Sequence, residues 1–117
     1  DWDSVKGIEG SKESAYRVSG VALNEFENAK HYVKATATHD LIVSRFTSDE
    51  YGEAYMLVNF ADRDGKNKIS VKLKDCRAVA VYGGKGYNGT PEIVELEDGK
   101  FTRELPYGDG IFVTPLV

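Results

Sequence analysis

The chain has 117 residues, of which 41% are hydrophobic and 29% are charged, so it fits one globular domain and a globally disordered chain is excluded. Its formal net charge of −4 argues against a nucleic-acid binder, and it lacks the run of about eighteen apolar residues that a membrane-spanning helix needs. The single cysteine, Cys76, rules out an internal disulfide, and we expect an inert, partly buried thiol.

The N-terminal residues 1–30 show no clean periodicity, because glycines interrupt every run. We expect an irregular segment or the first strands of the domain, with extended structure near Ala15–Val18 and a helical turn near Asn24–Lys30. The β-sandwich core is expected over residues 31–117, so that the whole chain forms a single domain.

From Tyr32 onward, short stretches alternate between apolar and polar residues, which is the period of a β-strand. The stretch HYVKATA alternates in this way, and the pattern places Tyr32 on the same face as Lys34 and Thr36. The stretch LIVSRF, at residues 41–46, predicts the next strand after a Thr-His-Asp turn.

The stretch EAYMLVNFA, at residues 53–61, is largely apolar on both alternating faces. We therefore expect a central strand that is covered on both sides. If the face that carries Tyr55 and Asn59 is buried, the strand is scaffold and any site lies at the loop ends, which is the interpretation that we favour. The following strand, ISVKL, should turn its apolar residues inward and its polar residues to water.

The second half of the chain is dense in strand and turn signals. RAVAVY leads into the glycine-rich loop GGKGYNGT, and Pro91 precedes the strand EIVEL. Asp98-Gly99 predicts a tight hairpin into FTREL, and a turn at residues 106–110 precedes IFVTPLV. Seven or eight short strands, with no room for crossover helices, predict an all-β fold, an antiparallel β-sandwich of jelly-roll or Greek-key type.

The succession AYMLVNFAD, AVAVYGG, IVELEDGKF and LPYGDGIFVTP resembles the C-terminal β-sandwich domains of multidomain glycoside hydrolases. The resemblance is to domains that follow a (β/α)₈ barrel in β-galactosidase-like bacterial enzymes, and it covers about residues 40–115. The matching positions are Val58-Asn59-Phe60, Leu105-Pro106, Gly108, Gly110 and Phe112-Val113-Thr114-Pro115.

This resemblance implies a non-catalytic accessory domain of a carbohydrate-active enzyme. The catalytic acid and nucleophile of such enzymes lie on the barrel, so no catalytic residue is carried over. The leading hypothesis is a carbohydrate-binding module for a plant-type polysaccharide, which would act outside the cell or at its surface. The alternative is a structural domain that packs on the catalytic domain of a parent enzyme and binds no sugar.

Carbohydrate-binding sandwiches stack sugar faces on exposed aromatic rings and bond the hydroxyl groups with amides and carboxylates. Aromatic residues in turns beside Gly, Asn and Asp are the strongest candidates, because packing within a strand is least required of them. The candidate ligand-binding residues are Trp2, Tyr51, Tyr87, Asn88, Tyr107 and Asp109.

Two other functions receive weaker support from the sequence. The loop at residues 62–67 carries oxygen ligands at alternate positions, so a structural calcium ion stays open, although three basic residues oppose it. The acidic pairs Asp49-Glu50 and Glu97-Asp98 lie in turns, without the cleft that a glycosidase dyad needs. We therefore expect neither a cofactor nor catalysis, and neither a nucleic-acid nor a membrane partner.

Overall fold

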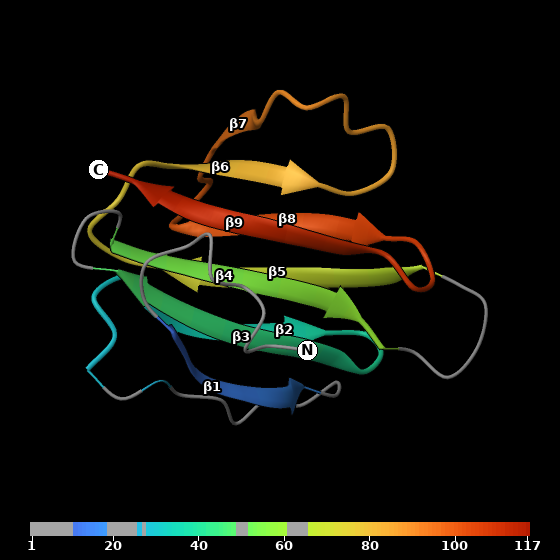
Figure 1. The fold of residues 1–117 in the computed structure, drawn as a ribbon, viewed down its shortest axis with the longest axis horizontal. Coiled ribbons are helices and arrows are strands. Elements are labelled where there is room, and N and C mark those ends of the chain that lie inside the picture. The colour runs from blue at the N-terminus through green and yellow to red at the C-terminus, as the bar shows by residue number, and fades with distance from the viewer. Residues whose placement is uncertain (1–10, 19–25, 27, 49–51, 61–65) are drawn as a thin grey trace.

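The computed structural model describes residues 11–18, 26, 28–48, 52–60 and 66–117. The strands in these ranges are β1 (Ser11–Val18), β2 (Tyr32–Ala37), β3 (Leu41–Ser48), β4 (Gly52–Asn59), β5 (Asn67–Leu73), β6 (Ala78–Gly83), β7 (Glu92–Glu95), β8 (Lys100–Leu105) and β9 (Gly110–Leu116). They form a six-stranded sheet in the order β1-β3-β4-β9-β6-β7 and a three-stranded sheet in the order β2-β5-β8 (Figure 1).

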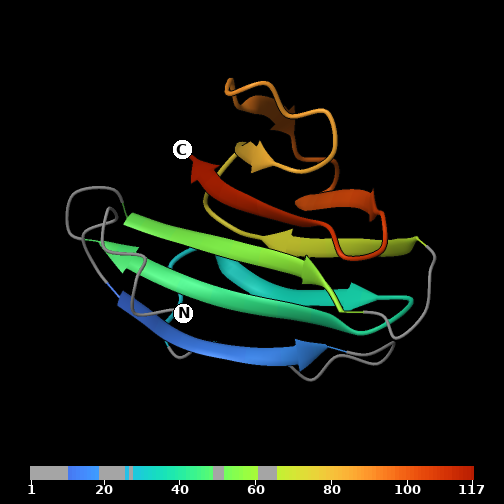
Figure 2. The ribbon, with the colours of Figure 1, turned by 45° about the vertical axis from the view of Figure 1, so that its right-hand side comes forward.

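The two sheets pack face to face, and every paired strand in them runs antiparallel to its neighbours (Figure 2). The predicted all-β, antiparallel β-sandwich is therefore confirmed, and no helix occurs within the described ranges. Nine strands form there, against seven or eight expected. The N-terminal strand β1 pairs with β3 at the edge of the larger sheet, although glycines around it obscure its pattern in the sequence.

The core lies between the sheets and is built from the inward side of each alternating strand. Ile69, Val71 and Leu73 of β5 are buried, while Ser70 and Lys72 between them face outward, as the sequence predicts. The largest of the apolar side chains that are less than 2% exposed are Tyr55, Phe101, Leu41, Leu57, Ile69, Leu105 and Ile111.

The central strand β4 is the middle of the larger sheet, between β3 and β9. Tyr55 is 1% exposed and Asn59 is 2% exposed, so the face of the strand that carries them is buried. Met56 and Val58 on the opposite face are half-buried. The strand is therefore scaffold, as expected, but it ends at Asn59 and leaves Phe60 half exposed.

Two buried asparagines tie the sheets together at one end of the sandwich. The Asn67 side chain donates to the carbonyl oxygens of His39 (3.0 Å) and Asp40 (2.9 Å), and its own oxygen accepts from the His39 N–H (3.0 Å). Asn59 donates to the carbonyl oxygens of Leu105 (3.0 Å) and Pro106 (2.9 Å). These bonds join the two asparagines to the backbone at the β2–β3 and β8–β9 turns, and so fix the turns at this end.

The Asp98-Gly99 hairpin forms as predicted. Asp98 and Gly99 have φ angles of 53° and 74°, and Glu97 and Lys100 exchange backbone hydrogen bonds of 3.0 and 2.9 Å across the turn. Positive φ at both central residues is the geometry of a type I′ turn, whose twist matches that of the flanking strands.

The alternation expected in β2 is wrong at its start. The register with β5 shifts between Tyr32 and Lys34, so that the extra residue Val33 is 36% exposed and Tyr32 turns into the core. A β-bulge of this kind reverses the facing of the residues before it, which local periodicity cannot reveal. Lys34 and Thr36 do share the outer face.

Candidate functional site

A cleft opens where the β6–β7 loop faces the C-terminal part of β8 and the β8–β9 turn. Its volume is about 210 Å³, which is below the roughly 300–1,000 Å³ of sites for drug-sized ligands. It therefore suits a ligand of about one sugar ring. The lining residues that carry polar side chains are Lys85, Tyr87, Asn88, Thr90, Glu92, Arg103, Glu104 and Asp109.

The β6–β7 loop, GGKGYNGT, turns tightly because its glycines adopt backbone angles that other residues avoid. Gly83, Gly84, Gly86 and Gly89 have φ angles between 85° and 96°. At Gly84 the loop also approaches β9 closely, since a Cβ there would lie 3.0 Å from Cγ2 of Ile111. The glycines thus let the loop fold over the start of β9 and form one wall of the cleft.

Asp109 connects this loop to the β8–β9 turn. Its Oδ2 accepts a hydrogen bond from the Lys85 N–H at 3.2 Å, and its own N–H donates to Pro106 O at 3.0 Å. Its carbonyl oxygen accepts from the Asn59 N–H at 2.9 Å. Because a carboxylate has about four lone-pair sites, Asp109 keeps acceptor capacity for a ligand hydroxyl group.

Tyr87 and Asn88 form the outer part of the loop. The Tyr87 N–H donates to Gly84 O at 3.2 Å, and the side chain is 41% exposed. Oδ1 of Asn88 accepts from the Thr90 N–H at 3.1 Å, which fixes the amide, while its amide nitrogen donates to none of the described residues. The loop therefore offers the exposed ring of Tyr87 and, on the next residue, the available amide donor of Asn88.

The opposite wall carries an ion pair that bridges the two sheets. Nη2 of Arg103 lies 3.0 Å from Oε1 of Glu92, and the guanidinium carbon lies 5.3 Å from the centroid of the Phe101 ring. The Glu92 side chain is 62% exposed, so the pair contributes at most about 1 kcal/mol to stability. Either partner can exchange this contact for one with a ligand at little cost.

The structure brings together Tyr87, Asn88 and Asp109, all three of which line the cleft. Tyr107 is 54% exposed at the tip of the β8–β9 turn, but it does not line the cleft. Trp2 and Tyr51 lie outside the described residues.

Sequence reasoning missed the contribution of Glu92 and Arg103 to this cleft. Both lie within alternating strands, where a polar residue is normally read as a solvent-facing position. Arg103 shares the inner face of β8 with Phe101 and Leu105, and that alternation was the available signal. The Glu92–Arg103 pair itself depends on the stacking of β7 over β8, which is a tertiary feature.

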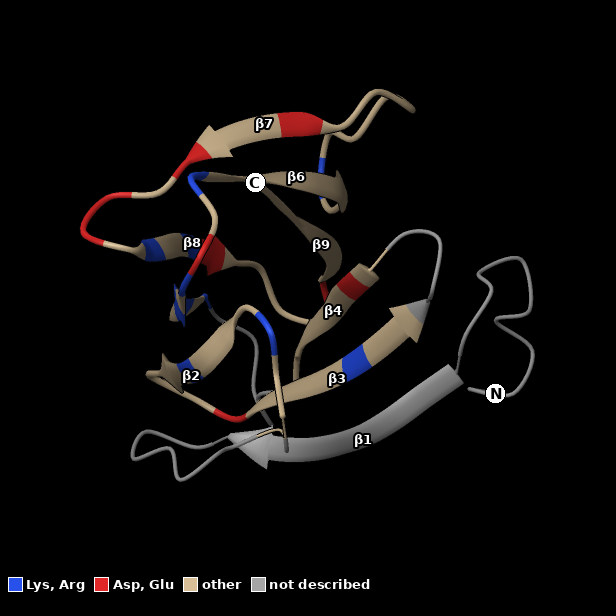
Figure 3. Ribbon diagram, turned by 90° about the vertical axis from the view of Figure 1, so that its left-hand side faces the viewer, with Lys and Arg blue, Asp and Glu red and all other residues tan. Residues whose placement is uncertain are grey.

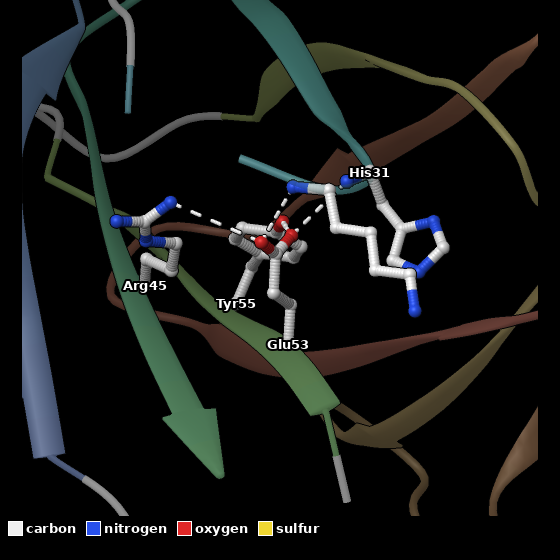
Figure 4. A network of polar contacts seen from close by, with 5 residues as sticks. His31, Arg45, Glu53 and Tyr55 are labelled. Carbon is white, nitrogen blue, oxygen red and sulfur yellow. Dashed lines mark hydrogen bonds and ion pairs between the residues drawn. The ribbon is translucent and has the colours of Figure 1, made fainter. Parts of the chain in front are cut away.

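A second polar cluster lies between β3, β4 and the segment before β2 (Figure 4). Glu53 accepts hydrogen bonds from the backbone N–H groups of Lys30 (2.6 Å) and His31 (3.1 Å), and from the hydroxyl of Tyr55. Nη1 of Arg45 lies 3.9 Å from Oε2 of Glu53, and the guanidinium carbon lies 5.2 Å from the centroid of the Phe26 ring.

Within this cluster the pKa of Glu53 is lowered and the pKa of Tyr55 is raised. Burial is the largest influence on Glu53 and raises its pKa, but the Lys30, Tyr55 and His31 hydrogen bonds and Arg45 together outweigh it and hold the pKa below its ordinary value. Burial, the hydrogen bond to Glu53 and its negative charge raise the pKa of Tyr55 well above its usual range. None of Arg45, Glu53 and Tyr55 lines the cleft described above. We therefore interpret the cluster as a structural tie.

The sequence suggests a possible calcium ligand set in the loop at residues 62–67 and an inert thiol at Cys76. Most of the loop at residues 62–67 lies outside the described residues, and Asn67 turns inward to bind backbone groups, which removes one potential calcium ligand. Cys76 is half-buried, and burial together with the nearby Asp75 raises the pKa of its thiol, as befits an inert cysteine.

Within the described ranges, no group of three or more His, Cys, Asp and Glu side chains is arranged to hold a metal ion. The described segments likewise include no helix with the length and apolar character needed to cross a bilayer. Comparisons with protein-family models, with curated proteins and with solved structures find no match to this chain.

Proposed function

We propose that this chain is a non-catalytic accessory domain of a carbohydrate-active enzyme, and that it binds a plant-type polysaccharide in the cleft between the β6–β7 loop and β8. One observation supports this most directly. Tyr87, Asn88 and Asp109 have side chains of the types that bind sugars, and they come from two separate loops to line one cleft.

The chemistry of these groups is matched to a sugar. The exposed face of Tyr87 offers a flat apolar platform for the C–H face of a pyranose ring. The Asn88 amide donates to a hydroxyl oxygen, and Asp109 accepts from a hydroxyl group. Glu92 and Arg103 on the opposite wall supply a further acceptor and donor at the ring's edge.

The size of the cleft limits the strength of this binding. A volume of about 210 Å³ holds one sugar unit, and a single unit buries too little surface for tight binding. The domain should therefore bind a polymer weakly at each unit and gain retention from the many repeats that one polysaccharide presents.

Affinity electrophoresis in native gels that contain soluble xylan, β-glucan, galactan or mannan tests this proposal. The domain should be retarded on at least one of these polymers, and Tyr87→Ala should weaken binding by about 1 kcal/mol or more. Tyr107→Ala is the matched control, because it removes an exposed tyrosine from outside the cleft and should leave retardation unchanged. Absence of retardation on every polymer, or equal loss in both variants, would contradict the proposal.

A second candidate function is supported by the outer face of the larger sheet. Met56, Phe112 and Tyr82 lie in register on the adjacent strands β4, β9 and β6, on the side away from the core. The rings of Tyr82 and Phe112 are 6.3 Å apart, and Ile93 on β7 is 57% exposed. A continuous apolar strip on a sheet face is typical of a surface that packs against another domain. The occupant would be the catalytic domain of the parent enzyme.

Binding of a hydrophobic dye such as ANS distinguishes this candidate. If the strip is an open docking face, the domain should enhance ANS fluorescence, and Tyr82→Lys with Ile93→Lys should abolish the enhancement without altering polysaccharide retardation. Weak ANS fluorescence from the unmodified domain would count against docking at this face.

A further inference from the structure

The outer face of the three-stranded sheet carries a row of lysines that the strand register creates. Lys34 of β2 lies opposite Lys72 of β5, and Lys72 lies opposite Lys100 of β8. All three side chains are exposed on the side of the sheet away from the core. Since neighbouring strands are about 4.8 Å apart, the row spans about 10 Å.

This row is unfavourable in the isolated domain. Like charges directly opposite one another on neighbouring strands destabilise a sheet. Among the described residues, no carboxylate forms an ion pair with any of the three lysines. Glu97 lies opposite Lys100 across the hairpin, so one exposed carboxylate follows the row at its β8 end without forming an ion pair. Lys34 and Lys72 therefore face no carboxylate in the row, although the whole chain carries a net charge of −4. Figure 3 marks the Lys and Arg positions of β2 and β8 in blue.

A second row, of hydroxyl groups, lies two residues away from the lysine in each strand. Thr36 is opposite Ser70, and Ser70 is opposite Thr102. Residues two apart in a strand are separated by about 7 Å, so this row runs parallel to the lysines at that distance. It lines a groove of about 680 Å³ that also includes Lys68 and Glu104.

The groove adjoins the sugar-binding cleft proposed above. Arg103 and Glu104 of β8 line both of them, so that only this edge strand lies between the cleft and the groove. A linear polymer with one unit beside Tyr87 can therefore pass over β8 and extend across the smaller sheet, beside the hydroxyl and lysine rows.

We propose that the outer face of the three-stranded sheet extends the binding site and that the polymer it accepts is an acidic polysaccharide, whose sugars carry carboxylates. This inference rests on the proposed function, because it names the substrate class of the same site. Lysines at strand spacing match carboxylates repeated along a chain, and the Thr-Ser-Thr row matches the hydroxyl groups between them.

Three other polyanionic partners fit the face less well. A single-stranded nucleic acid would use aromatic rings for base stacking, and the two rows contain none. A membrane surface would require apolar side chains among the lysines, and the rows carry only hydroxyl and ammonium groups. An acidic protein could bind the lysine row without using the groove beside it. The test below therefore includes these three classes of partner as alternatives.

The test is isothermal titration of the domain with an oligogalacturonate and with a neutral galacto-oligosaccharide of the same length, at about 20 and about 200 mM salt. The acidic ligand should bind more tightly, and its affinity should fall as the salt concentration rises. The triple variant Lys34→Gln, Lys72→Gln and Lys100→Gln should weaken acidic binding by about tenfold or more. Arg77→Gln, which removes an exposed charge from elsewhere, should not change it.

The variants separate this inference from the proposed function. Loss of acidic binding in the triple variant, with neutral binding retained and sensitive to Tyr87→Ala, supports both. Loss in the triple variant without any effect of Tyr87→Ala supports the lysine face and contradicts the cleft. Equal binding of the two oligosaccharides, or unchanged binding in the triple variant, overturns the inference. Tighter lysine-dependent binding of single-stranded DNA, anionic vesicles or a polyglutamate peptide also overturns it.

Discussion

Replacing Glu53 with glutamine should destabilise the domain, because this one carboxylate accepts several hydrogen bonds and carries the negative charge that faces Arg45. Its two oxygens accept hydrogen bonds from the Lys30 N–H, the His31 N–H and the Tyr55 hydroxyl, and they face the Arg45 guanidinium. The cluster joins the segment before β2 to the larger sheet (Figure 4). Its loss should therefore loosen the contact between the two layers at that end.

The magnitude follows from the geometry of the replacement. Glutamine retains one acceptor oxygen, but its amide nitrogen would point N–H atoms at a donor. Either the Lys30 N–H or the His31 N–H and Tyr55 hydroxyl therefore lose their acceptor, at a cost of about 1–3 kcal/mol. Arg45, which is 5% exposed, also loses the negative charge 3.9 Å from its Nη1. We expect Glu53→Gln to lower the free energy of unfolding by about 3 kcal/mol. Tyr55→Phe removes one donor from the same carboxylate and should cost about 1 kcal/mol.

Urea denaturation followed by circular dichroism measures this change, with Glu95→Gln as the control at an exposed glutamate. The control should lie within about 0.5 kcal/mol of the unmodified domain. The difference should also depend on pH. The folded-state pKa of Glu53 lies below its unfolded value of 4.5, so its stabilisation is complete above that pH and is lost as the pH falls through the folded pKa. A Glu53→Gln effect equal to that of the control, or one unchanged between neutral pH and pH 3, would refute this reasoning.

Three further predictions concern other parts of the fold. Asn67→Ala should lower the free energy of unfolding by about 3 kcal/mol in urea denaturation, because it removes a buried amide that makes three hydrogen bonds to the backbone of His39 and Asp40. A change below about 0.5 kcal/mol would show that these bonds do not hold the turns. Gly84→Ala should lower the free energy of unfolding by about 1 kcal/mol more than Gly86→Ala, since both glycines have positive φ but only Gly84 is close to Ile111. Equal thermal unfolding midpoints of the two variants would contradict the close approach. The Cys76 thiol should react with a disulfide reagent at pH 8 more slowly in the folded than in the urea-unfolded domain, because its raised pKa lowers the thiolate fraction; equal rates would disprove the burial.

The strands and the tightest turn could be predicted from the sequence because their determinants are local. Alternation with a period of two marks β5 directly, and Asp98-Gly99 specifies its turn through backbone angles that those two residues tolerate. The same rule, applied strictly, also places Arg45 on the buried face with Leu41 and Val43.

The candidate site was only partly accessible in this way. Residue type and loop position indicated Tyr87, Asn88 and Asp109, but not that Tyr107, with the same local signals, lies apart from the cleft. The proximity of Tyr87 to Asp109 depends on the pairing of β6 with β9 and on the glycine loop that folds back over it.

The sequence by itself determined that this chain is an antiparallel sandwich with β4 at its centre, because strand formation depends on short-range patterning and on which residues avoid water. Only the tertiary structure decided which residues meet. Lys34, Lys72 and Lys100 form a row because three strands distant in the sequence pair in one particular register. That register is set by core packing between the sheets and by the bulge at Val33, and neither is a property of any single segment.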